Sequence, residues 1–138
     1  MKICTFFGHR DAGEDIKPRL RQAIIDVIEK DGVRHFYVGS QGRFDRMAIS
    51  ALKELAPIYS IRYEVVLAYL DRQADLEDVP TFFPEGQEEV LPRFAIDRRN
   101  RWMVEQSDYV ISYTYKIAGG AVKFTRYAEK KGKVVIKI

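Results

Sequence analysis

The stretch His35-Phe36-Tyr37-Val38-Gly39-Ser40-Gln41-Gly42 joins an apolar run to a glycine-bearing turn, and a helical pattern begins directly after it. A short apolar run that ends in glycine is typical of a buried strand followed by a tight turn. Glycine lets the backbone approach a ligand closely, and the start of a helix presents free N–H groups and a positive dipole end. This turn is therefore a candidate anion-binding element.

The same arrangement recurs at two other places in the chain. Gly8-His9-Arg10 follows an apolar run at residues 3–7, and Ala118-Gly119-Gly120-Ala121 follows another at residues 109–113. None of the three turns carries a complete dinucleotide-binding or P-loop fingerprint, so each taken singly is compatible with an ordinary turn. Together they favour a phosphate- or nucleotide-binding crevice.

Strand-like and helix-like segments alternate along the chain. Apolar runs predict strands at residues 3–7, 36–38, 61–70, 108–113 and 134–138. Helical spacing predicts helices at about residues 16–28, 44–55, 95–106 and 121–131. Near-continuous apolar strands indicate a parallel sheet covered on both faces. We predict an α/β fold, a Rossmann-like three-layer sandwich with a mostly parallel five-stranded sheet and helices on both faces. Ligands bind at the carboxyl ends of such strands, where all three turns fall.

Composition is that of one soluble globular domain spanning residues 1–138, with 46% apolar and 31% charged residues. The single cysteine, Cys4, excludes an intramolecular disulfide and fits a reducing compartment. The sequence shows no apolar stretch long enough to span a bilayer and no signal peptide, so we expect a cytoplasmic protein without a membrane partner. Exposed apolar helix faces suggest a homodimer.

Residues 71–93 interrupt the alternation with seven acidic residues and three prolines. A long irregular insertion in a compact domain is usually functional or mobile. We interpret it as a lid or specificity loop with a short helix, and a solvent-exposed excursion is the alternative. The acidic insertion and the net charge of only +3 argue against a nucleic-acid partner.

Polar residues in the first two turns are candidates for ligand contacts. Arg10 suits a bidentate phosphate contact, and His9 suits a proton carrier or hydrogen-bond donor. The alternative for this segment is a polar loop capped by Asp11. Ser40 and Gln41 are placed to cradle phosphate or ribose oxygens. Asp45, just inside the next helix, suits ribose hydroxyls or is simply a favourable acid at a helix start.

Residues 97–103 form the densest polar cluster of the sequence. On a helix, Arg99 and Met103 share one side while Arg98 and Trp102 share another. One arginine is therefore expected to point into the crevice, unless the whole cluster is a solvated face. The helix after Gly119-Gly120 has no carboxylate in its first turn, which favours anion binding over acid–base chemistry. With only two histidines and no ligand spacing, we expect no metal site.

Several of these motifs in combination resemble the SLOG superfamily over nearly the whole chain. They are Gly8-His9-Arg10, Gly39-Ser40-Gln41-Gly42 with Asp45, Arg99-Asn100-Arg101-Trp102-Met103, Ser107-Asp108 and Gly119-Gly120. The resemblance is greatest to the small single-domain DUF1273 or YpsA-like proteins. The superfamily also contains the LOG phosphoribohydrolases and the DprA DNA-processing proteins. The resemblance implies a Rossmann-like fold and a nucleotide or nucleotide-derived ligand in the crevice.

Comparison with the LOG enzymes gives matches and departures. Arg99 matches their functional arginine, and Met103 and Asp108 lie at corresponding positions of the motif. Gly119-Gly120 match a glycine pair. Their next glycine, threonine and catalytic glutamate are replaced here by Val122, Lys123 and Arg126, and Ala118 replaces a proline. The missing glutamate argues against LOG-type hydrolysis, unless Glu85 or Glu88 substitutes for it.

Three functions follow as hypotheses. The leading one is a sensor or carrier that binds a nucleotide, with no other cofactor expected. The second is an N-glycosidic hydrolase or transferase acting on a nucleoside phosphate, with Arg99, Glu85 and Glu88 as candidate catalytic residues. The third is a DprA-like single-stranded DNA binder. The candidate ligand-binding residues are Gly8, His9, Arg10, Gly39, Ser40, Gln41, Gly42, Asp45, Arg99, Asn100, Gly119 and Gly120.

Overall fold

Six parallel strands form one sheet in the computed structural model, which describes residues 1–70 and 78–138. The order across the sheet is β4-β3-β2-β1-β5-β6. The strands are β1 (Ile3–Gly8), β2 (His35–Val38), β3 (Arg62–Val66), β4 (Thr81–Phe82), β5 (Tyr109–Tyr113) and β6 (Val134–Lys137). Every adjacent pair is parallel. The predicted parallel α/β architecture is therefore confirmed.

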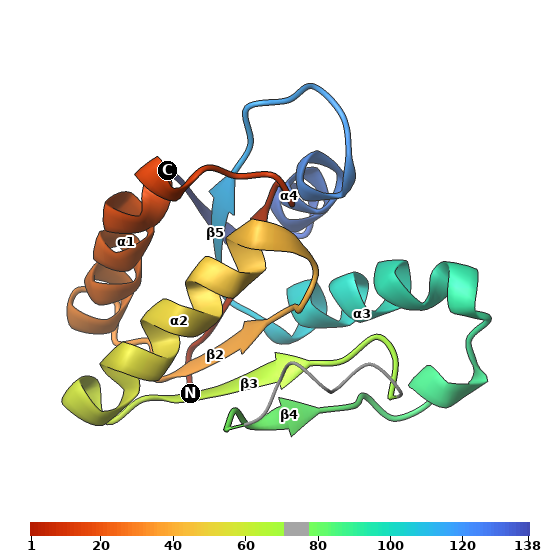
Figure 1. Ribbon diagram of the computed structural model, residues 1–138, viewed down its shortest axis with the longest axis horizontal. Coiled ribbons are helices and arrows are strands. Elements are labelled where there is room, and N and C mark those ends of the chain that lie inside the picture. Colours follow the sequence, from red (N-terminus) through yellow and green to blue (C-terminus); the bar gives the residue numbers. More distant parts are fainter. Residues whose placement is uncertain (71–77) are drawn as a thin grey trace.

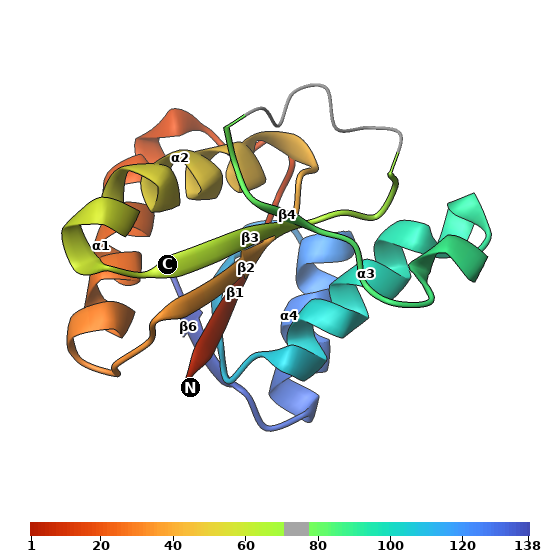
Figure 2. The ribbon, with the colours of Figure 1, turned by 90° about the horizontal axis from the view of Figure 1, so that it is seen from below.

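Four α-helices cover the two faces of the sheet (Figures 1 and 2). Helices α1 (Lys17–Glu29) and α2 (Gly42–Tyr59) lie on one face, and α3 (Pro92–Gln106) and α4 (Gly120–Lys130) lie on the other. Two short 3-10 helices, η1 (Glu14–Ile16) and η2 (Gln87–Glu89), precede α1 and α3. In the described part of the chain, no helix is long and apolar enough to cross a membrane.

The core is divided between the two faces of the sheet, because successive side chains of a strand point to opposite sides. Phe6 packs on the α1–α2 side, where its ring stacks on Phe36 at 6.0 Å. Its neighbour Phe7 packs on the other side, against Phe124 at 5.6 Å. Cys4 is fully buried, and burial raises the pKa of its thiol. This alternation explains why β1 reads as an unbroken apolar run.

Three predicted boundaries were wrong in detail. Helix α2 continues to Tyr59 with Pro57 inside it, although the sequence predicted an end before that proline. Pro57 lies in the last turn, so the break that proline causes has little helix left to disturb. Helix α3 begins at Pro92, where the missing N–H costs no intrahelical bond. Strand β3 ends at Val66, although the apolar run continues to residue 70.

The sheet has six strands rather than the predicted five, and the additional strand comes from the insertion. Strand β4 has only two residues, which pair with Val65 and Val66, and it is too short for an alternating pattern to show in the sequence. The short helix expected in the insertion is η2. Gln87 anchors it, because its buried Nε2 donates to Ala95 O (2.7 Å) and Ala68 O (3.3 Å). Residues 71–77 of the insertion lie outside the described residues, and its role as a lid stays a prediction.

Candidate functional site

A cavity of about 330 Å³ opens at the carboxyl end of β1. The chain proceeds from β1 through β2 and β3 to one side of the sheet, and β5 and β6 lie on the other side. The strand order therefore reverses beside β1, which is where sheets of this class bind ligands. We call this cavity the crevice. Its lining residues are Phe6, Phe7, Gly8, His9, Arg10, Gln41, Asp45, Ile96, Arg99, Asn100, Met103, Gly120 and Ala121.

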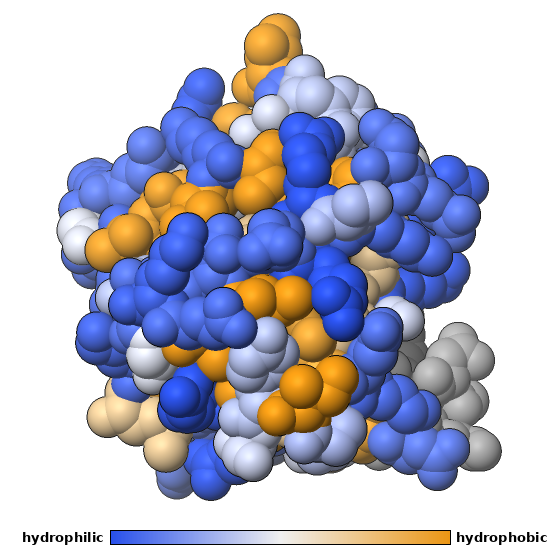
Figure 3. Space-filling view, turned by 90° about the vertical axis from the view of Figure 1, so that its left-hand side faces the viewer, coloured by the Kyte–Doolittle hydropathy of each residue, from blue (hydrophilic) through white to orange (hydrophobic). Residues whose placement is uncertain are grey.

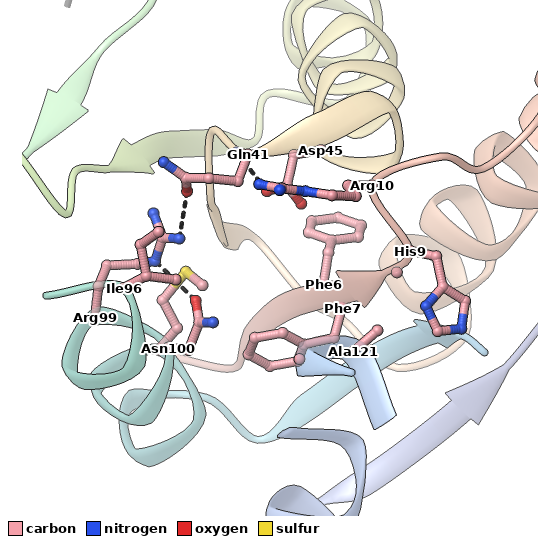
Figure 4. Close-up of a pocket in the computed structure, with 13 residues that line it drawn as sticks. Phe6, Phe7, His9, Arg10, Gln41, Asp45, Ile96, Arg99, Asn100 and Ala121 are labelled. Atoms are coloured by element: carbon pink, nitrogen blue, oxygen red, sulfur yellow. Dashed lines mark hydrogen bonds between the residues drawn. The ribbon is translucent and has the colours of Figure 1, made fainter. Parts of the chain in front are cut away.

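The three glycine-bearing turns meet around the crevice. Figure 4 shows Gln41, Asp45 and Arg10 along one wall and Asn100, Phe7 and Ala121 along the opposite wall. Of the candidate ligand-binding residues, the lining set contains Gly8, His9, Arg10, Gln41, Asp45, Arg99, Asn100 and Gly120. Gly39, Ser40, Gly42 and Gly119 belong to the turns but are not lining residues. The apolar lining residues Phe6, Phe7, Ile96 and Met103 were missed, because their spacing indicates only a buried core.

Close backbone packing joins the turn after β1 to the turn after β2. Arg43 N–H donates to Arg10 O at 2.8 Å. Gly42 has a φ of +90°, and a Cβ added there would lie 2.4 Å from Arg10 Cα. A Cβ on Gly8 would lie 2.1 Å from the ring of Phe44, which is fully buried. These two glycines therefore allow a contact that any larger residue would prevent.

Arg99 is the largest of the fully buried side chains. Its guanidinium donates to Val66 O (2.8 Å) at the end of β3, to Gln41 Oε1 (2.5 Å) and to Asn100 Oδ1 (2.8 Å). Burial lowers the pKa of Arg99, and the charge of Asp45 opposes this effect. Three of its five donors are thus used within the protein. Arg99 fixes the turn after β2 against β3 and α3, and so shapes the crevice wall.

The neighbouring arginines follow the predicted division between the helix sides. Arg98 donates to Gln87 Oε1 at 3.1 Å, and Arg101 pairs with Asp97 at 2.8 Å. Lys123 of α4 also pairs with Asp97, and neither residue lines the crevice. Arg99 is therefore the arginine of the α3 cluster that points inward.

Asp45 accepts the N–H of Gln41 at 2.9 Å and so caps the start of its own helix. Burial raises the pKa of Asp45 to about 6, while Arg99, this hydrogen bond and Arg10 lower it. Among the residues that the structure describes, Asp45 is the single carboxylate of the crevice lining. Glu85 and Glu88 are both exposed and do not line the crevice.

The pKa of Asp45 leads to a testable pH dependence of stability. Its folded pKa of about 6 exceeds the ordinary value of 3.8, so between these values the folded state holds a proton that the unfolded chain releases. The contribution of Asp45 to stability therefore falls as the pH rises through this window. Asp45→Asn keeps an oxygen that can accept the Gln41 N–H. At about pH 7.5 it should raise the free energy of unfolding by about 1–2 kcal/mol, and by less at about pH 4.5. Urea unfolding at both pH values measures this, and a gain that is equal at the two would contradict it.

A network of polar contacts ties the loop after β5 to the loop after β1. Asp11 accepts from Tyr115 Oη (2.7 Å) and Lys116 Nζ (2.8 Å), and these hydrogen bonds lower its pKa to about 2. His9 Nε2 accepts the Lys116 N–H at 3.2 Å, and its ring packs on Tyr115 at 4.6 Å. Burial lowers the pKa of His9, and Lys116 lowers it further. The imidazole is therefore neutral near pH 7, and its Nε2 is engaged by the protein backbone.

Helix α4 points its amino end at the crevice. Gly119 begins the helix with a φ of +115°, and no side chain caps it. The N–H groups of the first turn, including those of Gly120 and Ala121, have no intrahelical partner and carry the positive end of the helix dipole. Arg10, also part of the lining, is exposed and forms no ion pair within residues 1–70 and 78–138. The crevice thus combines an open helix start with an exposed guanidinium, whose charge also acts on Asp45.

Comparison with known proteins gives a match at the level of structure. No protein-family model matches the chain, and no curated protein matches it. The solved structure of DNA processing protein A (DprA) from Streptococcus pneumoniae is similar with a TM-score of 0.73 and 16% identity, over 99% of this chain and 50% of that one. DprA from Helicobacter pylori, described for its single-stranded DNA binding mode, is similar with a TM-score of 0.63 and 17% identity. This match covers 99% of this chain and 64% of that one.

These neighbours correct one expectation from the sequence. The modest net charge and the acidic insertion argued against a nucleic-acid partner, whereas the H. pylori neighbour binds single-stranded DNA. The expectation was wrong because net charge averages over the whole chain and says nothing of the charge at one site. The chain spans about half to two thirds of the length of these neighbours. At this level of identity, the comparison establishes that the chain has the Rossmann-like fold found in the DprA proteins.

Proposed function

We propose that the crevice binds the phosphate backbone of single-stranded nucleic acid. The observation that carries the proposal is the presence in one cavity of two groups that suit a phosphate, the open start of α4 at Gly120 and the exposed guanidinium of Arg10. A helix start and an arginine are the two protein groups best suited to a phosphate. Gln41 and Asn100 add amide groups to the same lining.

Two further features support a strand as the ligand. Tyr115 is 52% exposed beside His9, so an aromatic face is available for base stacking next to the phosphate groups. The chain shares its fold with a protein that binds single-stranded DNA. In this proposal Arg10, Gly120 and Ala121 contact phosphate, Gly8 and Gly42 allow the turns to approach each other, and Arg99 is a positioning residue.

Substitution of Arg10 tests this proposal. Arg10→Ala should weaken binding of a fluorescent oligo(dT) of about twelve nucleotides by about tenfold in an anisotropy titration. The slope of log affinity against log salt should fall by about 0.7, the value for one lost phosphate contact with a single strand. Arg62→Ala is the matched control, because Arg62 is an exposed arginine at the opposite end of the strands. Equal affinities of the Arg10 and Arg62 variants would refute the proposal.

A free nucleotide is the second candidate ligand, in a protein that acts as a sensor or carrier. The cavity volume of about 330 Å³ favours it, because it falls in the range of small-molecule sites. Competition separates the two ligands: a nucleoside monophosphate should displace the oligonucleotide only at far higher concentration if the strand is the ligand. Chromatography of the same mixtures detects any free base, which N-glycosidic cleavage would release.

A further inference from the structure

A second groove of about 510 Å³ lies beside the crevice, between η1 and the first half of α2. Three cationic side chains line it, those of Lys17, Arg43 and Arg46, together with Met47, Ser50 and Glu14. We call it the arginine groove. Figure 3 views the molecule from the side of α1 and α2, and hydrophilic residues cover most of this face with smaller hydrophobic areas between them.

The two arginines of this groove lack countercharges. Arg43 and Arg46 are exposed, and neither side chain forms an ion pair or hydrogen bond with any residue that the structure describes. They lie three positions apart on one helix, where like charges repel each other. Some other arginines do have acidic partners, for example Arg21 with Glu54 and Arg101 with Asp97. The charge of the arginine groove is therefore available to an external anion.

Backbone contacts join the segment that lines the crevice to the segment that lines the arginine groove. Arg43 N–H donates to Arg10 O at 2.8 Å, and Gly42 packs directly on the backbone of Arg10. Arg10 lines the crevice, whereas Arg43 and Arg46 line the groove. The three arginines thus follow one another along two segments that are in contact. A ligand that contacts all three must therefore extend from the crevice into the groove.

We infer that the arginine groove is a second phosphate-binding subsite, and that the ligand is a polynucleotide strand which continues from Arg10 over Arg43 and Arg46. This inference rests on the proposed function of the crevice and extends it from one phosphate to a run of phosphates. In this inference the groove makes affinity depend on the length of the ligand. A mononucleotide occupies the crevice alone, and a longer single strand occupies both the crevice and the groove.

The test compares ligands of different length on a double variant. Arg43→Ala/Arg46→Ala should weaken binding of oligo(dT) of about twelve nucleotides by at least about tenfold, and should lower the salt slope by about 1.4, the value for two phosphates. Its affinity for thymidine monophosphate should equal that of the unmodified protein. Lys130→Ala/Lys133→Ala removes the same charge from the end of α4 and the loop before β6, and should leave both affinities unchanged. Because the side chains of Arg43 and Arg46 have no partner among residues 1–70 and 78–138, the melting temperature of the double variant should also stay unchanged.

The possible failures can be told apart. If the unmodified protein binds the oligonucleotide and Arg10→Ala weakens it, but the double variant binds with the same affinity and salt slope, the inference fails and the proposed function stands. If the double variant loses the mononucleotide to the same extent as the oligonucleotide, the groove is not a length-dependent subsite and the inference also fails. If the unmodified protein binds no oligonucleotide, both the inference and the proposed function fail.

Discussion

Replacement of Arg99 by alanine is expected to lower the free energy of unfolding by about 3–5 kcal/mol. The guanidinium is 2% exposed and donates to Val66 O, Gln41 Oε1 and Asn100 Oδ1. Its removal leaves these acceptors without a donor and opens a cavity under the turn after β2. It also removes a charge that lowers the pKa of Asp45, so that carboxylate becomes harder to keep ionised.

Urea unfolding followed by circular dichroism measures this effect. Arg101→Ala is the control from the same helix, because Arg101 is an exposed arginine that pairs only with Asp97 among its described carboxylate neighbours. Its cost should stay within about 1 kcal/mol, as for other exposed ion pairs. Similar costs for the two variants would mean that Arg99 does not hold the crevice wall in place.

Gly42→Ala should cost about 2–4 kcal/mol of stability and abolish oligonucleotide binding. The residue has a φ of +90°, which a residue with a Cβ adopts only with strain. The added Cβ would also lie 2.4 Å from Arg10 Cα, so the backbone of the first turn must move. Because Arg10 is proposed to contact phosphate, this movement disrupts the site as well as the fold.

Gly132→Ala separates the cost of backbone strain from the cost of the close contact with Arg10. Gly132 has a similar φ of +77°, but a Cβ there would meet nothing within 4 Å. Its cost is therefore the backbone strain alone, about 1 kcal/mol, and it should leave binding intact. Thermal melts and anisotropy titrations of the two variants give the comparison. Equal destabilisation would show that the contact between the two turns is unimportant.

The architecture could be predicted from the sequence because the strands are buried on both faces. Phe6 and Phe7 point to opposite sides of the sheet, yet both are apolar, which is the pattern of a covered parallel sheet. Strand β4 could not be predicted, because it has two residues and its place is set by pairing with Val65 and Val66.

The location of the candidate site followed from the glycine turns, whereas the behaviour of individual residues did not. Spacing predicted that one arginine of residues 97–103 points inward, and only the contacts with Val66 and Gln41 reveal that Arg99 is this arginine and that it holds the wall. Net charge argued against a nucleic-acid partner, but it averages over the whole chain and does not show where cations gather. Arg10, Arg43 and Arg46 come together only when the turn after β1 packs on the start of α2.

The central claim is that the crevice holds the phosphates of a nucleic-acid strand. An amide NMR titration of isotope-labelled protein with oligo(dT) of about twelve nucleotides tests it most directly, because it reports the site residue by residue. The account predicts saturable shifts that are largest at Gly120, Ala121 and the segment around Arg10, with none at the amino ends of β2 and β3. Saturable binding that shifts the amide signals of other surfaces and leaves those of Gly120 and Ala121 unchanged would contradict it.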